Sequence, residues 1–102
     1  MSDFQKIGNK NDIENGSMKS FTVAGKQVAV ANIDGQYFAI DEICSHAHCS
    51  LADGFLDGQT VICPCHGSTF DLTNGKVMSM PATQDIASYQ VKIEGDDILI
   101  QL

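Results

Sequence analysis

Two short runs of sequence, Cys44-Ser45-His46 and Cys63-Pro64-Cys65-His66, decide how this chain folds, and sixteen residues separate them. Each run carries a thiol and an imidazole, which suit a soft or borderline metal. In extended backbone, Cys44 and His46 point to the same side because they are two residues apart. The proline of the second run fixes one backbone angle and favours a turn that aims Cys63 and His66 inward. The pattern therefore predicts a metal centre with these four residues as ligands.

Zinc is one candidate for this centre, because two thiolates and two imidazoles also make a zinc site. Finger-type zinc sites normally pair Cys with Cys and His with His, whereas each run here mixes the two residue types. His48 lies two residues beyond His46, and we interpret it as a surface residue rather than a ligand. The mixed spacing argues against zinc, but a zinc-stabilised interaction module stays an alternative interpretation of the sequence.

The spacing C-x-H, sixteen residues, C-x-x-H closely resembles that of the Rieske iron–sulfur family, in which two Cys hold one iron of a [2Fe–2S] cluster and two His hold the other. The resemblance covers essentially the whole chain. It implies one such cluster, held by Cys44, His46, Cys63 and His66. Mixed ligation leaves the oxidised site neutral, and this raises its reduction potential above that of an all-thiolate cluster.

Three further positions follow the family pattern around the cluster. Ser68 matches a residue whose hydroxyl donates to a bridging sulfide, and Phe70 stands where high-potential members carry a tyrosine. Pro81 falls where a third, proline-containing loop closes over the cluster. One hydroxyl donor is kept and the other is absent, so the resemblance predicts a midpoint potential between those of the low-potential ferredoxins and the respiratory proteins.

The two remaining cysteines, Cys49 and Cys65, match positions that carry a disulfide in the respiratory branch of the family. A bridge between them would clamp the two ligand-bearing loops together. A cytoplasmic setting argues against a stable disulfide, and the ferredoxins of dioxygenase systems usually lack these two cysteines. The resemblance favours a Cys49–Cys65 disulfide, with a pair of packed free thiols as the alternative.

Short runs of alternating apolar and polar residues fill most of the chain, and no helical period lasts beyond a turn or two. Asp34-Gly35 between two β-rich runs predicts a hairpin turn, and a capped helical turn or loop is expected over residues 11–16. We expect one all-β domain over residues 1–102, a Rieske-like antiparallel sandwich or barrel. Its base would comprise about residues 1–42 and 82–102, with a cluster-binding part inserted over about residues 43–81. Strands are predicted over residues 4–8, 17–23, 28–31, 37–40, 61–62, 70–72, 89–93 and 98–102.

The formal net charge of −7 argues against nucleic acid or an anionic membrane as a partner, because both would repel the chain. The charge favours docking on a basic protein surface instead. The first residues contain no apolar signal segment, and no apolar run reaches the roughly 18 residues that span a bilayer. We therefore expect a cytoplasmic protein, and we also expect a monomer.

The overall look of the chain is similar to the Rieske-type ferredoxins that serve ring-hydroxylating dioxygenases. Such a carrier would take an electron from a flavin-containing, NAD(P)H-dependent reductase and pass it to a terminal oxygenase. The sequence has no phosphate-binding glycine loop and no nucleophile–base pair outside the metal site, so we do not expect an enzyme. The alternative is the small Rieske subunit of another oxidoreductase, such as a nitrite reductase or arsenite oxidase.

Overall fold

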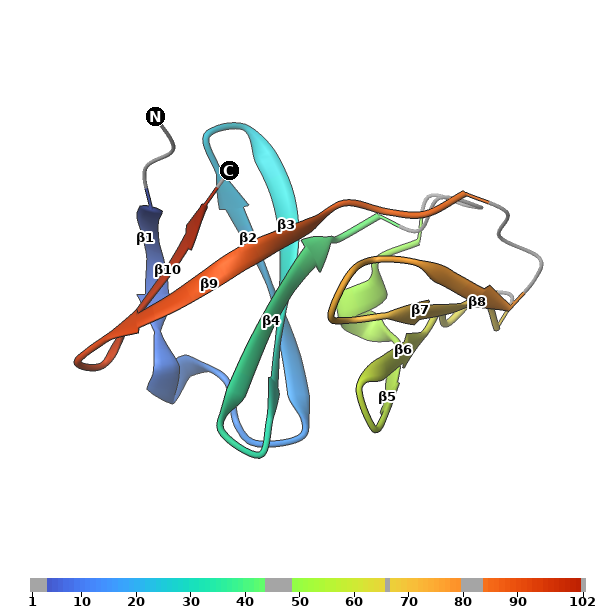
Figure 1. Ribbon diagram of the computed structural model, residues 1–102, viewed down its shortest axis with the longest axis horizontal. Coiled ribbons are helices and arrows are strands. Elements are labelled where there is room, and N and C mark those ends of the chain that lie inside the picture. The colour runs from blue at the N-terminus through green and yellow to red at the C-terminus, as the bar shows by residue number, and fades with distance from the viewer. Residues whose placement is uncertain (1–3, 44–48, 66, 80–83, 102) are drawn as a thin grey trace.

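The computed structural model describes residues 4–43, 49–65, 67–79 and 84–101. These residues form two antiparallel β-sheets that lie side by side along the long axis of the molecule (Figure 1). Two short 3-10 turns, η1 (Lys10–Asp12) and η2 (Leu51–Asp53), are the helical elements of this part of the chain. No helix among the described residues is long and apolar enough to cross a membrane. The all-β antiparallel fold that the sequence predicts is confirmed.

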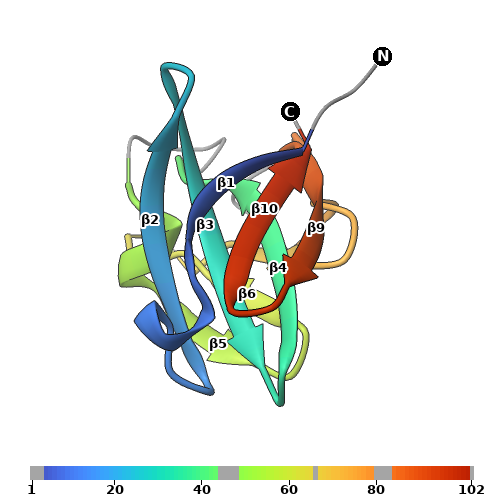
Figure 2. The same ribbon diagram turned by 90° about the vertical axis from the view of Figure 1, so that its left-hand side faces the viewer.

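The larger sheet, which we name the base, has six strands in the order β1-β10-β9-β4-β3-β2 and curls into a half-barrel (Figure 2). The first and last strands of the chain pair with each other inside this sheet. Both ends of the described chain therefore belong to the base. Its strands are β1 (Phe4–Asn9), β2 (Ser17–Val23), β3 (Lys26–Ile33), β4 (Gln36–Asp41), β9 (Ser88–Glu94) and β10 (Asp97–Gln101).

Two tight turns connect β2, β3 and β4. In the first, Ala24 and Gly25 have φ of 51° and 81°; in the second, Asp34 and Gly35 have φ of 52° and 86°. Positive φ at both central residues is the type I′ geometry, whose twist matches that of a hairpin. The hairpin predicted at Asp34-Gly35 is therefore present, and β3 and β4 pair along its length.

The smaller sheet has four strands in the order β5-β6-β7-β8 and is inserted in the chain between β4 and β9. The sequence predicts β6 and β7, but it does not predict β5 and β8. A strand of three residues is too short to show a clear alternating pattern. The four strands are β5 (Phe55–Asp57), β6 (Thr60–Ile62), β7 (Thr69–Asp71) and β8 (Val77–Ser79).

Two groups of buried apolar side chains stabilise the sheets. The first lies within the base and contains Ile13, Val23, Val28, Val30, Ala39, Ile98 and Ile100. The second, which we name the joint core, combines residues of both sheets with residues of the connecting segments: Ala29, Ala31, Ile40, Leu51, Val61, Cys63, Phe70, Leu72 and Ile86. Successive residues of β3 face opposite sides of the sheet, so this strand contributes alternately to the two groups. The small sheet is thus packed against the outer face of the base.

Candidate metal centre

Cys63 is the one predicted ligand that the described residues include. Cys44, His46 and His66 lie outside the described residues, and so does Pro81. Cys63 follows directly after β6, carries a free thiol and is only 2% exposed. It belongs to the joint core, so the strand fixes its backbone and the surrounding side chains shield its sulfur from water.

The turn after Cys63 is closed by two backbone hydrogen bonds. The Cys63 N–H donates to the Ser68 carbonyl at 2.7 Å, and the Gly67 N–H donates to the Cys63 carbonyl at 3.1 Å. Gly67 has a φ of 79°, a left-handed conformation that glycine adopts without steric cost. Pro64 and Cys65 are exposed in this turn. The described residues of the second run therefore form the turn that the sequence predicts.

Ser68 and Phe70 follow the turn into the interior, and both side chains are fully buried. Phe70 lies on β7 opposite Val61 of β6, and all three residues of the group Val61, Cys63 and Phe70 belong to the joint core. Phe70 is the largest fully buried side chain among the described residues. It therefore has a packing role between the two sheets, which the sequence alone does not indicate.

The residues on either side of the first predicted ligand run, Ile43 and Ser50, are also held together. Ile43 and Ser50 form an isolated antiparallel bridge, and the Leu51 N–H donates to the Glu42 carbonyl at 2.7 Å. The Ser50 hydroxyl donates to Glu42 Oε2 at 2.7 Å and so partly satisfies a carboxylate that is nearly buried. Residues 43 and 50 are therefore neighbours, and the chain between them begins and ends at one place.

A disulfide joins Cys49 to Cys65, whose Cα atoms are 6.4 Å apart. Cys49 directly precedes Ser50 of the closed segment, and Cys65 lies in the turn after Cys63. The bond therefore connects the two segments that carry the predicted ligands. Of the two states predicted for this pair, the structure has the disulfide rather than two free thiols.

The chain enters and leaves the small-sheet region at the same point of the base. Asp41, the last residue of β4, donates its N–H to the Ala87 carbonyl at 3.0 Å. Its carboxylate accepts from the Ala87 N–H at 3.1 Å and from the Tyr89 hydroxyl at 2.5 Å. The Lys26 ammonium donates to the same hydroxyl at 3.3 Å. We name Lys26, Asp41, Ala87 and Tyr89 the latch.

Two groups of the latch have shifted pKa values. Burial, together with the hydrogen bond to Asp41, raises the pKa of the Tyr89 phenol above its usual value. The hydrogen bond to Tyr89 raises the pKa of the Lys26 ammonium. At neutral pH the Tyr89 phenol therefore stays protonated, and its hydroxyl donates a hydrogen bond to the Asp41 carboxylate.

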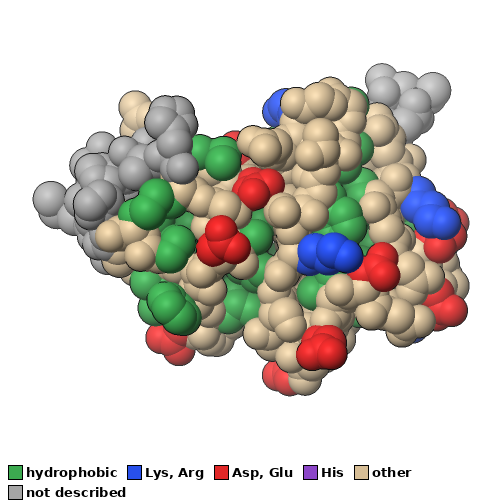
Figure 3. All heavy atoms as spheres, turned by 180° about the vertical axis from the view of Figure 1, so that it is seen from behind, with side chains coloured by type: hydrophobic (Ala, Val, Ile, Leu, Met, Phe, Trp, Pro, Cys, Tyr) green, Lys and Arg blue, Asp and Glu red, His purple; other side chains and the backbone are tan. Residues whose placement is uncertain are grey.

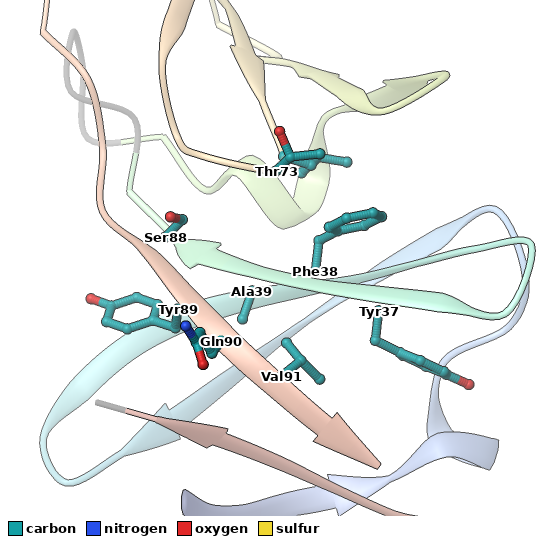
Figure 4. Close-up of a pocket in the computed structure, with 9 residues that line it drawn as sticks. Tyr37, Phe38, Ala39, Thr73, Ser88, Tyr89, Gln90 and Val91 are labelled. Carbon is teal, nitrogen blue, oxygen red and sulfur yellow. The ribbon is translucent and has the colours of Figure 1, made fainter. Parts of the chain in front are cut away.

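A cavity of about 510 Å³ opens beside the latch, where β4 and β9 separate (Figure 4). The two strands pair only at Ala39↔Tyr89 and Ile40↔Ser88. Tyr37, Phe38, Leu72 and Thr73 are among the residues that line the cavity, and the Phe38 ring lies on the side of β4 that faces Thr73. Its nine lining residues include no Cys, His, Asp, Glu, Lys or Arg, so the cavity offers neither a metal ligand nor an acid–base pair.

The two most exposed large hydrophobic side chains of the described residues lie on the edge strands of the small sheet. Phe55 on β5 is 66% exposed, and Met78 on β8 is 60% exposed. Exposed carboxylates at Asp53 and Asp57 flank Phe55 in the sequence. Figure 3 shows hydrophobic and acidic side chains next to one another at this end of the molecule. Apolar side chains bordered by charge suit contact with another protein.

Together these features define a small antiparallel β domain in which a disulfide ties two cysteine-bearing segments at one end. The Rieske [2Fe–2S] domain family matches residues 3–90, and the chain belongs to this family.

The chain is similar to the ferredoxin component of the naphthalene 1,2-dioxygenase system of Pseudomonas aeruginosa. The two are 38% identical over 91 residues, which cover 89% of this chain and 88% of the relative. The solved ferredoxin of Sphingomonas yanoikuyae B1 matches with a TM-score of 0.91 and 29% identity, over 98% of this chain and 99% of that one. A chain from a complex of reduced oxygenase and oxidized ferredoxin in carbazole 1,9a-dioxygenase has a TM-score of 0.88 and 26% identity, over 95% of this chain and 91% of that one.

The cofactor of this family is a Rieske-type [2Fe–2S] cluster, and the described residues fit it. Cys63 offers a buried thiol, whereas the disulfide removes Cys49 and Cys65 from the set of thiol ligands. The chain has four cysteines, so Cys44 and Cys63 remain, as mixed ligation by two thiolates and two imidazoles requires. Two thiolates and two imidazoles also suit zinc, so it is family membership that favours the cluster.

Proposed function

We propose that this chain is the ferredoxin component of a ring-hydroxylating dioxygenase system. It carries single electrons in the cytoplasm, as a monomer, from an NAD(P)H-dependent flavoprotein reductase to a terminal oxygenase. The chain is an electron carrier and not itself the catalyst. The observation that carries the proposal is the closed turn after the buried thiol of Cys63, in a chain 38% identical to a dioxygenase-system ferredoxin.

We assign Cys44 and Cys63 to one iron and His46 and His66 to the other. When bound, the cluster takes up and releases one electron at a time. The chain fixes the backbone of Cys63 at the end of β6 and shields its sulfur from water. We infer that the cluster-binding part spans about residues 43–81, the range that contains the small sheet, and that Pro81 belongs to its third loop.

Ser68 and Phe70 give this ferredoxin an intermediate midpoint potential. The Ser68 hydroxyl is buried directly after the turn, where it stabilises negative charge that is added on reduction. Phe70 has no hydroxyl and contributes only packing in the same core. One of the two donors that raise the potential in the family is therefore present.

The acidic surface supports transient docking on a basic partner. The chain has a formal net charge of −7, and Asp53 and Asp57 border the exposed ring of Phe55. A terminal oxygenase with an apolar hollow bordered by Lys and Arg complements this surface. Because charges at an exposed rim are screened by salt, the association rate should fall as ionic strength rises.

An EPR-monitored redox titration of the purified protein, combined with iron and acid-labile sulfide analysis, tests the cluster. We expect a Rieske-type signal in the reduced state and a midpoint between the low-potential ferredoxins and the respiratory proteins. The variants Cys63→Ser and His66→Ala should lose this signal. His48→Ala is the matched control, because it removes an imidazole that we do not count as a ligand, and it should keep the signal.

A protein free of iron and sulfide after reconstitution, or an unchanged spectrum in His66→Ala, would contradict the ligand assignment. The carrier role is tested separately, by adding the oxidised protein to a flavoprotein reductase with NADH and then to an oxygenase. Reduction of the oxygenase only when the chain is present supports the role. Permanent co-purification with a large oxidoreductase subunit would instead favour the small-subunit alternative.

A further inference from the structure

The Cys49–Cys65 disulfide lies at the surface, and its two ends are unequal. Cys65 is exposed in the turn after Cys63. Cys49 is half-buried and packs against the joint core. Exchange begins when an attacking thiolate reaches one of the two sulfurs, so access decides which sulfur it attacks. The exposed end of this bond is Cys65.

The bond links two segments that are each closed without it. Hydrogen bonds between Cys63, Gly67 and Ser68 close the turn. The Ile43↔Ser50 bridge closes the other segment. Opening the disulfide should therefore leave both segments folded at their bases and free their connection near the predicted ligands. Breaking this disulfide should therefore affect how tightly the cofactor is held more than it affects the stability of the fold.

The compartment makes such a bond unusual. Disulfides are rare where glutathione and thioredoxins keep thiols reduced, and those found there are mostly transient or redox-sensing. Exposed disulfides are also the more easily reduced ones. The cytoplasmic location is part of the proposed function, so this step rests on that proposal, whereas the exposure of Cys65 does not.

We propose that Cys49–Cys65 is a site of thiol–disulfide exchange with a protein dithiol, and that its reduction weakens retention of the cluster. A thiolate of the dithiol attacks Cys65 Sγ, the Cys49–Cys65 bond breaks, and Cys49 leaves as the free thiol. The second thiol of the reductant then breaks the mixed disulfide and releases Cys65. Two electrons and two protons pass to the chain, and the reductant becomes a disulfide.

The first experiment traps the mixed disulfide. The purified oxidised protein is incubated with a reduced thioredoxin whose resolving cysteine is replaced by serine, and the adduct is digested and mapped by mass spectrometry. We expect the link at Cys65. A link at Cys49, or no adduct in the native protein while the urea-unfolded protein forms one, would overturn the proposal.

The second experiment measures cluster retention. The protein as isolated is treated with wild-type thioredoxin, its reductase and NADPH, and iron release to a chelator is followed with the visible spectrum. We expect release to accelerate by a factor on the order of 10 to 100, the size of the affinity loss that follows removal of groups that orient metal ligands. The double variant Cys49→Ala/Cys65→Ala should release iron at the faster rate with or without thioredoxin.

Equal release from the oxidised protein and the double variant would overturn the proposal. Far-UV circular dichroism of the double variant checks that the sheets remain folded. Iron and sulfide analysis before treatment tests the proposed function separately, and thiol formation at Cys49 and Cys65 is read by alkylation whether or not iron is bound. Failure of the cluster assignment and failure of the exchange site are therefore distinguishable.

Discussion

The base and the small sheet are held together by different means. The strands of the base are five to eight residues long and enclose a core of their own. The strands of the small sheet are three residues long, and their buried side chains belong to a core shared with the base. The small sheet therefore depends on the core that it shares with the base and on backbone contacts, whereas the base contains its own stabilising core.

Close backbone approaches show this dependence. The Ile86 N–H donates to the Gly75 carbonyl at 2.9 Å, and a Cβ on Gly75 would overlap the Ile86 carbonyl oxygen. A Cβ on Gly54 would overlap the Ile62 carbonyl oxygen in the same way. Three turns of the base differ, because a Cβ on Gly25, Gly35 or Gly95 would meet no atom within 4 Å.

The largest expected effect comes from truncating the side chain that spans the two sheets. Phe70→Ala should lower the free energy of unfolding by about 3–5 kcal/mol, as measured by urea denaturation with circular dichroism, because it opens a cavity in the joint core. It should also accelerate iron release. Ile98→Val, in the core of the base, should cost about 0.5–1.5 kcal/mol and leave iron release unchanged. Equal iron release from the two variants would erase the contrast between the regions.

The next effect compares two glycines with similar backbone angles. Gly75 and Gly25 have φ of 76° and 81°, but only Gly75 faces a backbone oxygen. Gly25→Ala should cost about 1–2 kcal/mol, the penalty for a left-handed L-residue. Gly75→Ala should cost roughly 2–4 kcal/mol, because backbone must also move. Urea denaturation measures the loss in free energy of unfolding for both variants. An equal loss would show that the backbone around Gly75 adjusts as easily as the hairpin turn at Gly25.

A smaller effect concerns the latch, which closes the base where the chain leaves for the small sheet and returns from it. Tyr89→Phe removes the hydrogen bond to Asp41 and should cost about 1 kcal/mol at neutral pH. The folded state holds the Tyr89 proton more tightly than the unfolded state, because its pKa is raised from 10.0. This contribution is fully present below pH 10.0 and is lost as the pH rises through the raised pKa. Between neutral and alkaline pH, the free energy of unfolding should therefore fall more steeply with pH for the wild type than for Tyr89→Phe. An equal pH dependence in the two proteins would contradict the role assigned to Tyr89.

The smallest effect on stability is expected at the exposed surface. Phe55→Ser should change the free energy of unfolding by no more than about 0.5 kcal/mol, because the ring is 66% exposed. It should nevertheless raise the KM for this ferredoxin several-fold in an electron-transfer assay whose acceptor is the oxygenase component of a naphthalene 1,2-dioxygenase system. Ile93→Ser is the matched control on the base, where the side chain is 37% exposed, and its KM should stay unchanged. A rise in KM for Ile93→Ser alone would move the docking surface to the base.

Local sequence signals predict the base better than the small sheet. The Asp34-Gly35 turn and the alternation along β10 are properties of neighbouring residues, and the structure contains both. Gly54 and Gly75 carry no such signal, because their importance arises from backbone segments distant in the sequence. Asp41 and Tyr89 are likewise 48 positions apart, and no periodicity connects them.

The candidate metal centre likewise has one feature that the sequence predicts and one that it does not. The spacing of thiols and imidazoles is enough to identify Cys63 as a ligand candidate, because chemistry alone restricts the residues that hold such a cofactor. The packing role of Phe70 could not be predicted, since an aromatic residue in a short strand looks the same whether or not two sheets meet on it.

The latch also has a consequence for how this architecture can change. Asp41 and Ala87 are hydrogen-bonded to each other, so the chain between them leaves the base and returns to it at the same place. Replacing or lengthening the chain between Asp41 and Ala87 need not displace any strand of the base. Grafting a relative's segment between these two residues should therefore leave the host scaffold folded if the graft keeps apolar side chains over Ala29, Ala31 and Ile40.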